Sequence, residues 1–166
     1  MKEKEELSNK VIFLDLDGTI INTISGETFP KGIWDMKFNF ELLDALKKIK
    51  PSKIGIVTNQ GGIGIFVPEI HFRDKLQYIE QAIAEYVDCK CYGIYCVSNV
   101  KENYDRKPNP GMLEELSMNF GFLKEDCIMI GDASGLEGQF SDSDKKTAEN
   151  FGIPYYDVNE FINKFK

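Results

Sequence analysis

Short apolar runs alternate along the chain with longer segments in which apolar residues recur at helical spacing. A short run, Ile153–Tyr156, predicts an edge strand. No repeat or linker-like stretch divides residues 1–166, so we expect one domain, with residues 1–10 as a mobile N-terminal extension. Four further runs are almost continuously apolar, as strands covered on both faces of a sheet are: Val11–Leu16, Ile54–Val57, Tyr92–Val97 and Cys127–Ile130.

The segments between the runs are typical of helices with defined ends. Apolar residues at spacings of four, three and four over residues 72–83 predict an amphipathic helix that begins near Pro68. A second helix is expected to have Asn109 as its N-cap, Pro110 in its first turn and Gly121 at its end. Two further helices are expected at pairs that resemble capping boxes, Ser141 with Asp144 and Asp157 with Glu160.

The alternation of strands and helices predicts an α/β fold, a doubly wound, Rossmann-like parallel sheet of about five strands. Ligands of such sheets bind beyond the carboxyl ends of the strands, so the polar residues that follow each strand are the candidates for chemistry. Three acids and one lysine in one crevice suit a hard cation together with a phosphate. The segments concerned are Asp15-Leu16-Asp17-Gly18-Thr19, Thr58-Asn59, Arg106-Lys107-Pro108 and Gly131-Asp132.

Composition and charge narrow the class of protein further. With 42% hydrophobic and 28% charged residues, the chain is expected to be globular rather than disordered. No apolar run approaches the roughly 20 residues that a membrane helix needs, so we expect a cytoplasmic protein with no membrane partner. We also expect a monomer. The net charge of −7 disfavours binding to a nucleic-acid backbone on average, although a local basic patch can still bind one.

Four motifs in fixed order indicate a family. Asp-x-Asp-Gly-Thr after an apolar strand, followed by Thr-Asn, Arg-Lys-Pro and Gly-Asp, resembles the haloacid dehalogenase (HAD) superfamily of phosphatases. The resemblance implies the HAD-type fold, without a large cap domain because the segment between Asp17 and Thr58 leaves room only for a hairpin flap. It also implies a phosphoric monoester hydrolase that depends on Mg²⁺ and forms an aspartyl-phosphate.

The likeness is narrower over the stretch from Val11 to about Phe161. SGETFP at residues 25–30, the pair Trp34-Asp35, RKPNPGM and FSDSDKKTAENFGIPY resemble the 3′-phosphatase domain of polynucleotide kinase/phosphatase. That family implies removal of a 3′-phosphate from DNA in repair, with a nucleic-acid 3′ end as the partner. No GxxxxGK[ST] phosphate loop occurs in the sequence, so the kinase half is not expected.

The competing interpretation is a phosphatase for a small metabolite. Histidinol-phosphate and heptose-bisphosphate phosphatases share TNQxGI, RKPxPGM and AENxGI with this chain. Both families usually carry an arginine shortly after TNQxGI, where this sequence has Ile65. The zinc loop of the heptose-type enzymes, CxH…CxC, fits poorly, because His71 lies far from Cys89 and Cys91. A phosphatase-like binding module without activity is disfavoured by the complete set of acidic, hydroxyl and lysine residues.

The resemblance implies a role for each residue of the set. Asp15 would attack phosphorus, and Asp17 would protonate the leaving oxygen and then activate water. Thr58 and Asn59 would hold the transferring phosphoryl oxygens. Lys107 would bridge the phosphate and the Asp15 carboxylate.

Metal and substrate contacts are implied in the same way. Mg²⁺ would be held by the side chains of Asp15 and Asp132 and by the backbone carbonyl of Asp17. Asp144 would be an outer partner of the ion through water. Arg106 would bind a more distant phosphate of the substrate, because its planar fork suits bidentate contact.

Overall fold

The computed structural model describes residues 2–166, and its centre is a parallel sheet of five strands. The strands lie in the spatial order β5-β4-β1-β6-β7, and all four neighbouring pairs are parallel. This arrangement confirms the predicted doubly wound α/β fold. The strands are β1 (Val11–Leu14), β4 (Lys53–Asn59), β5 (Lys90–Cys96), β6 (Cys127–Gly131) and β7 (Tyr155–Asp157).

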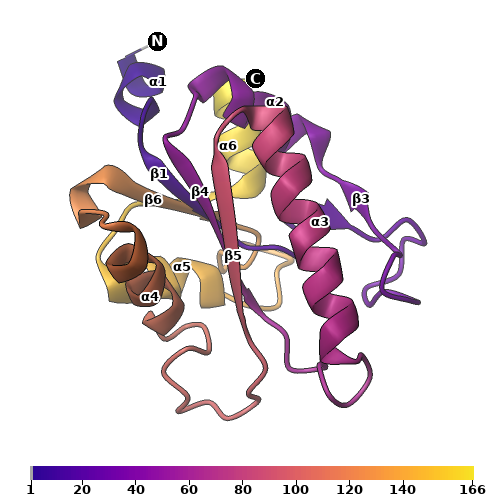
Figure 1. Ribbon diagram of the computed structural model, residues 1–166. Helices are drawn as coiled ribbons and strands as arrows, with labels where there is room; N and C mark the ends of the chain where they lie inside the picture. Colours follow the sequence, from indigo (N-terminus) through magenta and orange to yellow (C-terminus); the bar gives the residue numbers. More distant parts are fainter. Residues whose placement is uncertain (1) are drawn as a thin grey trace.

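Helices cover both faces of this sheet (Figure 1). On β1, Ile12 and Leu14 pack into the core under α2, α3 and α6, whereas Val11 and Phe13 pack into the core under α4 and α5. Successive strand residues point to opposite faces, so a strand covered on both sides is apolar at every position. The helices are α2 (Phe40–Ile49), α3 (Glu69–Val87), α4 (Gly111–Phe120), α5 (Ser143–Phe151) and α6 (Val158–Phe165), with a 3₁₀ turn, η1, at Lys124–Asp126.

The strand that leads into the site is shorter than its apolar run. β1 ends at Leu14, not at Leu16, because the Leu16 carbonyl accepts from the backbone N–H groups of residues 19–21 and the chain turns there. Leu16 is nevertheless fully buried. The predicted edge strand is also shifted, since β7 begins at Tyr155. The apolar pattern therefore predicts which residues are buried more accurately than it predicts where the strands begin and end.

Two of the predicted helix starts are wrong. Pro110, not Asn109, caps α4, since the Asn109 amide donates instead to the carbonyls of Lys101 and Asn103. The capping box at Ser141 does not form. Asp142 is the N-cap of α5, and the Asp144 carboxylate is drawn away from the helix end into an ion pair.

Two other helix starts agree with the sequence. Helix α3 begins at Glu69, directly after Pro68 at its N-cap, as predicted. The Asp157 side chain caps α6 and accepts from the Asn159 N–H at 3.1 Å.

The N-terminal segment is helical and packs against the rest of the domain. Residues 2–7 form the helix α1 (Lys2–Leu7); Leu7 is buried and Glu3 pairs with Lys164 of α6 at 2.5 Å. Residue 1 lies outside the described residues, and the mobility expected of residues 1–10 stays a prediction.

Within residues 2–166, no helix combines the length and apolarity needed to cross a bilayer.

A small flap is the insertion between β1 and α2. It consists of the antiparallel strands β2 (Ile21–Asn22) and β3 (Lys37–Phe38) and the loop between them, so no large cap domain is present in the part of the chain described. The Asp35 carboxylate accepts from the Ser25 hydroxyl at 2.6 Å and from the backbone N–H groups of Ser25 and Lys31, each at 2.9 Å. These bonds, that of the Ser25 hydroxyl first, lower the pKa of Asp35 to about 2. The loop that contains SGETFP and the Trp34-Asp35 pair is therefore held closed by hydrogen bonds to the carboxylate of Asp35, its last residue.

Candidate active site

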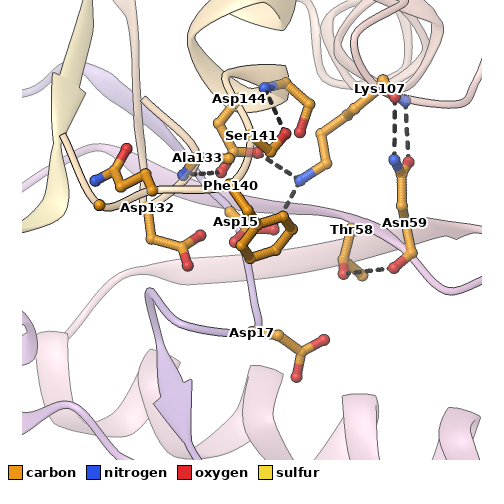
Figure 2. Close-up of a pocket in the computed structure, with 13 residues that line it drawn as sticks. Asp15, Asp17, Thr58, Asn59, Lys107, Asp132, Ala133, Phe140, Ser141 and Asp144 are labelled. Atoms are coloured by element: carbon orange, nitrogen blue, oxygen red, sulfur yellow. Dashed lines mark hydrogen bonds and ion pairs between the residues drawn. The ribbon is translucent and has the colours of Figure 1, made fainter. Parts of the chain in front are cut away.

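A cavity of about 360 Å³ opens beyond the carboxyl ends of β1, β4 and β6 (Figure 2). These strands are neighbours in the sheet, so residues far apart in the sequence meet at one edge. Loop residues that include Phe140 and Ser141 complete the wall. The residues predicted for the site that line the cavity are Asp15, Asp17, Thr58, Asn59, Lys107 and Asp132.

A buried ion-pair chain forms the floor of this cavity. The Lys107 ammonium lies 2.7 Å from Asp15 Oδ1 and 2.7 Å from Asp144 Oδ1. All three side chains are almost completely removed from solvent. A buried charge is tolerated only when it is paired and hydrogen-bonded, and here each charge is both. The floor therefore fixes one carboxylate, that of Asp15, against a positive charge.

Asp144 is committed to this arrangement through both of its carboxylate oxygens. Oδ1 accepts from Lys107, and Oδ2 accepts from the Ala133 N–H at 3.0 Å. The residue lies in the first turn of α5, where a negative charge is favoured by the helix dipole. We therefore assign Asp144 to the orientation of Lys107. The sequence predicts Asp144 as a capping acid and as an outer partner of the cation, and neither prediction points to Lys107.

Lys107 is also held by its own backbone. The Asn59 side chain donates from Nδ2 to the Lys107 carbonyl at 3.1 Å and accepts from the Lys107 N–H at 2.9 Å. Both ends of the Asn59 amide are thus used to join the end of β4 to the loop that carries Lys107. The contact of Asn59 with phosphoryl oxygens stays a prediction.

Gln60 has no predicted role in the sequence, yet its side chain contacts two of the predicted site residues. Its Nε2 donates to Asp17 Oδ2 at 2.8 Å and to Thr58 Oγ1 at 2.9 Å. Asp17 is exposed and lies apart from the Asp15–Lys107–Asp144 group (Figure 2). Gln60 holds the Asp17 carboxylate at the cavity and links it to Thr58, which is buried. The signal was present in the TNQ motif, which extends one residue beyond the predicted Thr-Asn pair.

The turn after β1 brings Asp15 and Asp132 close together. The buried Thr19 hydroxyl donates to Asp15 Oδ2 at 3.3 Å and lies 3.5 Å from Asp132 Oδ1. Gly18 has a φ of +82°, and a Cβ there would lie 2.0 Å from Asp132 Oδ2. Only glycine fits this turn, because it both tolerates the positive φ and leaves room for the neighbouring carboxylate.

The electrostatics of the floor favour a bound cation. Burial opposes the charge of Lys107, but Asp15 and Asp144 outweigh it and raise the pKa of Lys107. Burial first, and the charge of Asp15 second, raise the pKa of Asp132 to about 8 and also raise the pKa of Asp144. Three carboxyl groups face one lysine, so ionisation of all three leaves negative charge in excess, which a bound cation would offset.

The same carboxylates have the spacing of metal ligands. One oxygen from each of Asp15, Asp132 and Asp144 lies within 4.8 Å of the other two. Both oxygens of Asp144 are engaged at 2.7 and 3.0 Å, whereas Asp15 Oδ2 accepts only the longer 3.3 Å bond from Thr19, so Asp15 and Asp132 are the candidate ligands. Oxygen donors of this kind suit Mg²⁺, so the donor set fits the cation predicted from the sequence.

Two positions singled out in the sequence lie away from the floor. Arg106 does not line the cavity, and its guanidinium donates to the Ser98 carbonyl at 3.0 Å. Its contact with substrate stays a prediction. Ile65, which stands where related phosphatases usually carry an arginine, is 68% exposed on the loop after β4 and brings no positive charge.

Comparison with known proteins agrees with this geometry. The model of the family described as polynucleotide kinase 3 phosphatase matches residues 10–162. The chain belongs to this family. Together with the HAD-like fold and the phosphatases among its relatives, the match shows that the protein is a phosphoric monoester hydrolase of the HAD superfamily.

Individual relatives differ in how much of their own length the similarity covers. The bifunctional polynucleotide phosphatase/kinase of Schizosaccharomyces pombe is 30% identical over 96% of this chain but 39% of its own length. An uncharacterised 20.8 kDa protein of Autographa californica nuclear polyhedrosis virus is 32% identical over 92% of this chain and 85% of its own. The D-glycero-alpha-D-manno-heptose-1,7-bisphosphate 7-phosphatase of Photorhabdus laumondii is 30% identical over 87% and 79%.

A solved structure confirms the fold. A D,D-heptose 1,7-bisphosphate phosphatase from B. bronchiseptica, complexed with magnesium and phosphate, superposes with a TM-score of 0.64 at 17% identity. The superposition covers 93% of this chain and 97% of that one. At this identity the likeness speaks for the fold alone.

Proposed function

We propose that the protein is a Mg²⁺-dependent polynucleotide 3′-phosphatase that acts through an aspartyl-phosphate on Asp15. The observation that carries this proposal is the Asp15 carboxylate at the cavity floor, 2.7 Å from the buried Lys107 ammonium and facing the solvent-connected cavity. A phosphate monoester is a dianion and repels a carboxylate nucleophile. Lys107 offsets this repulsion at the point of attack.

The chemistry divides between the two aspartates of the DxDGT motif. Asp15 forms an O–P bond while the bond from phosphorus to the leaving oxygen breaks, and Asp17 donates its proton to that oxygen. Asp17 then takes a proton from a water molecule, which attacks phosphorus and releases Asp15 and inorganic phosphate. The exposure of Asp17 and its bond to Gln60 suit this exchange, because the carboxyl is oriented and in contact with water.

The cation has a defined place in this proposal. Asp15 and Asp132 would hold Mg²⁺ through their side chains, and the Asp17 backbone carbonyl would complete the protein ligands. When bound, the ion would supply positive charge that stabilises the negative charge on the phosphoryl oxygens. Lys107 and Thr58, which also line the cavity, would act on the same oxygens.

The choice of a polynucleotide rests on the family match and on the flap. The match covers residues 10–162, which includes the flap segment and the loop of Phe140. The flap is a two-stranded hairpin, so the cavity stays accessible to the end of a polymer. Removal of 3′-phosphates would place the enzyme in DNA repair.

A second candidate is a heptose-bisphosphate phosphatase, favoured by the 30% identity with the enzyme of P. laumondii over 79% of its length. A substrate panel separates the two candidates. A 3′-phosphorylated oligonucleotide, heptose bisphosphate and histidinol phosphate are compared by kcat/KM under identical Mg²⁺ and salt. We expect the oligonucleotide to be hydrolysed fastest and its kcat/KM to fall steeply with salt. Much faster turnover of either metabolite would overturn the proposal.

A further inference from the structure

A lysine on α3 is buried without a partner. Lys75 is 5% exposed, yet none of the described residues forms a hydrogen bond or an ion pair with its ammonium. Buried lysines are rare unless they are paired. No fully enclosed side-chain nitrogen or oxygen of the described residues lacks a partner, so the Lys75 ammonium must reach solvent at its tip. A buried stem therefore carries an accessible and uncommitted charge.

The surroundings of Lys75 place this charge beside the site. Burial is the largest influence and lowers the pKa of Lys75, while the carboxylates of Asp17 and Asp35 act in the opposite direction. Asp17 belongs to the cavity and Asp35 to the flap. Tyr78, one turn further along α3, packs edge-on against Trp34 of the flap, with ring centroids 5.6 Å apart. The flap therefore covers this part of α3, and Lys75 lies where α3 and the flap approach Asp17.

Neither carboxylate forms an ion pair with Lys75, and both are oriented by other donors. Asp17 accepts from Gln60, and Asp35 accepts from three donors of its own loop. Other cations of the site are also committed, since Lys107 is paired with two aspartates and Arg106 donates to a backbone carbonyl. The exposed Ile65 adds none. The anionic substrate is left as the partner of Lys75.

The position of Lys75 indicates which part of the substrate its ammonium contacts. On the proposed mechanism Asp17 protonates the leaving oxygen, so groups near Asp17 face the leaving group rather than the transferred phosphoryl. The leaving group of a polynucleotide is the 3′-hydroxyl of the last nucleotide. That nucleotide carries the chain's next negative charge on its 5′ side, as a phosphodiester.

We propose that Lys75 binds the phosphodiester that precedes the terminal 3′-phosphate, and so selects a polynucleotide over a mononucleotide. This inference rests on the proposed function and adds the residue that recognises the polymer. It also explains how a chain with a net charge of −7 can bind a polyanion, since one placed charge acts at the mouth of the site.

The test uses three thymidine substrates that share the 3′-phosphate and differ in what precedes the terminal nucleotide. They are the 3′-monophosphate, a 3′-phosphorylated dinucleotide with a natural phosphodiester, and the same dinucleotide with a neutral methylphosphonate. For the wild-type enzyme we expect kcat/KM on the natural dinucleotide to exceed that on the other two by about tenfold or more.

Lys75→Met keeps the buried stem and removes the charge. We expect it to lower kcat/KM on the natural dinucleotide by about tenfold or more, with a much smaller loss on the methylphosphonate, and to be partly rescued in Lys75→Arg. Lys48→Met, an equal change of charge on an exposed residue at the far end of α2, is the matched control and should show no such preference.

The outcomes separate the two proposals. Equal losses on all three substrates in Lys75→Met, or no loss on any, would overturn the role of Lys75 alone. Wild-type enzyme that leaves every 3′-phosphorylated nucleotide intact while cleaving heptose bisphosphate would overturn the proposed function. The methylphosphonate comparison needs no variant. Equal turnover of the two dinucleotides by wild-type enzyme would therefore overturn the role of Lys75 even if Lys75→Met fails to fold.

Discussion

The floor of the cavity and the loops around its mouth differ in the side chains that they bury and expose. At the floor, Asp15, Lys107 and Asp144 are charged and at most 7% exposed. In the mouth loops, which we define as residues 23–36, 60–68 and 132–142, Phe29, Phe66 and Phe140 are 81%, 85% and 97% exposed. Of these three rings, only Phe140 lines the cavity. Charges are buried where phosphoryl chemistry needs them, and apolar rings are exposed in the surrounding loops.

This difference suggests that the floor carries out the chemistry and that the mouth loops contact the rest of the substrate. The floor carries the DxDGT, lysine and aspartate set, which the sequence shares with phosphatases of several substrates. The Phe140 loop is ordered by Gln139, whose Oε1 accepts from the Ser134 N–H at 2.8 Å and whose Nε2 donates to Asp157 at 3.0 Å. A fixed loop that presents one exposed ring beside the cavity is suited to contact the substrate beyond its phosphate.

The largest effect is expected at the nucleophile. Asp15→Asn keeps the shape of the side chain but removes its charge and nucleophilicity. We expect turnover of p-nitrophenyl phosphate to fall by at least about 10³-fold. A variant that retains more than about a tenth of the wild-type rate would show that Asp15 forms no covalent intermediate.

Removal of the cation should have an effect of similar size. With excess negative charge on the floor, chelation by EDTA should abolish the activity, and added Mg²⁺ should restore it. Steady-state rates and elemental analysis of the purified protein test this together. Full activity after exhaustive chelation, or one tightly bound zinc ion per chain, would contradict the oxygen-ligand site.

The third effect tests the floor without touching the reacting atoms. Asp144→Asn retains an acceptor for the Ala133 N–H but loses the ion pair with Lys107. Because Lys107 is then held from one side, we expect kcat to fall by about 10²-fold on every substrate. The free energy of unfolding, followed by urea denaturation, shows whether the fold survives. An unchanged kcat would exclude Asp144 from the orientation of Lys107.

The smallest effect is expected at the mouth. Phe140→Ala removes a ring that packs on nothing in the free enzyme, so stability should be unchanged. If the ring stacks on a base, kcat/KM on a 3′-phosphorylated oligonucleotide should fall by about five- to twentyfold. Phe29→Ala, in the flap loop, is the matched control for loss of an exposed ring. An equal loss on p-nitrophenyl phosphate would show that Phe140 serves the floor instead.

The sequence predicted those parts of the molecule that depend on local pattern. Buried strands are apolar at every position, and polar residues directly after them mark the site, so Asp15, Asp17, Thr58 and Asp132 were placed at the cavity. Lys107 was also placed there, although it lies on a loop rather than at a strand end.

What escaped prediction depends on partners distant in the sequence. Asp144 has the position of a capping acid, but its partner Lys107 lies 37 residues earlier, and burial makes that pair stronger than a cap. Asn109 was misassigned for the same reason, since the carbonyls it meets are not visible in a helix pattern. Lys75 did leave a signal, because it shares the apolar face of α3 with Phe72 and Ile79.

The most direct test of the division between floor and mouth is one ratio. We divide kcat/KM on a 3′-phosphorylated oligonucleotide by kcat/KM on p-nitrophenyl phosphate, for the wild-type enzyme, Asp144→Asn and Phe140→Ala. Asp144→Asn should lower both values and leave the ratio within about twofold of wild type. Phe140→Ala should lower the ratio by at least about fivefold. A ratio that changes in Asp144→Asn and stays constant in Phe140→Ala would contradict the account.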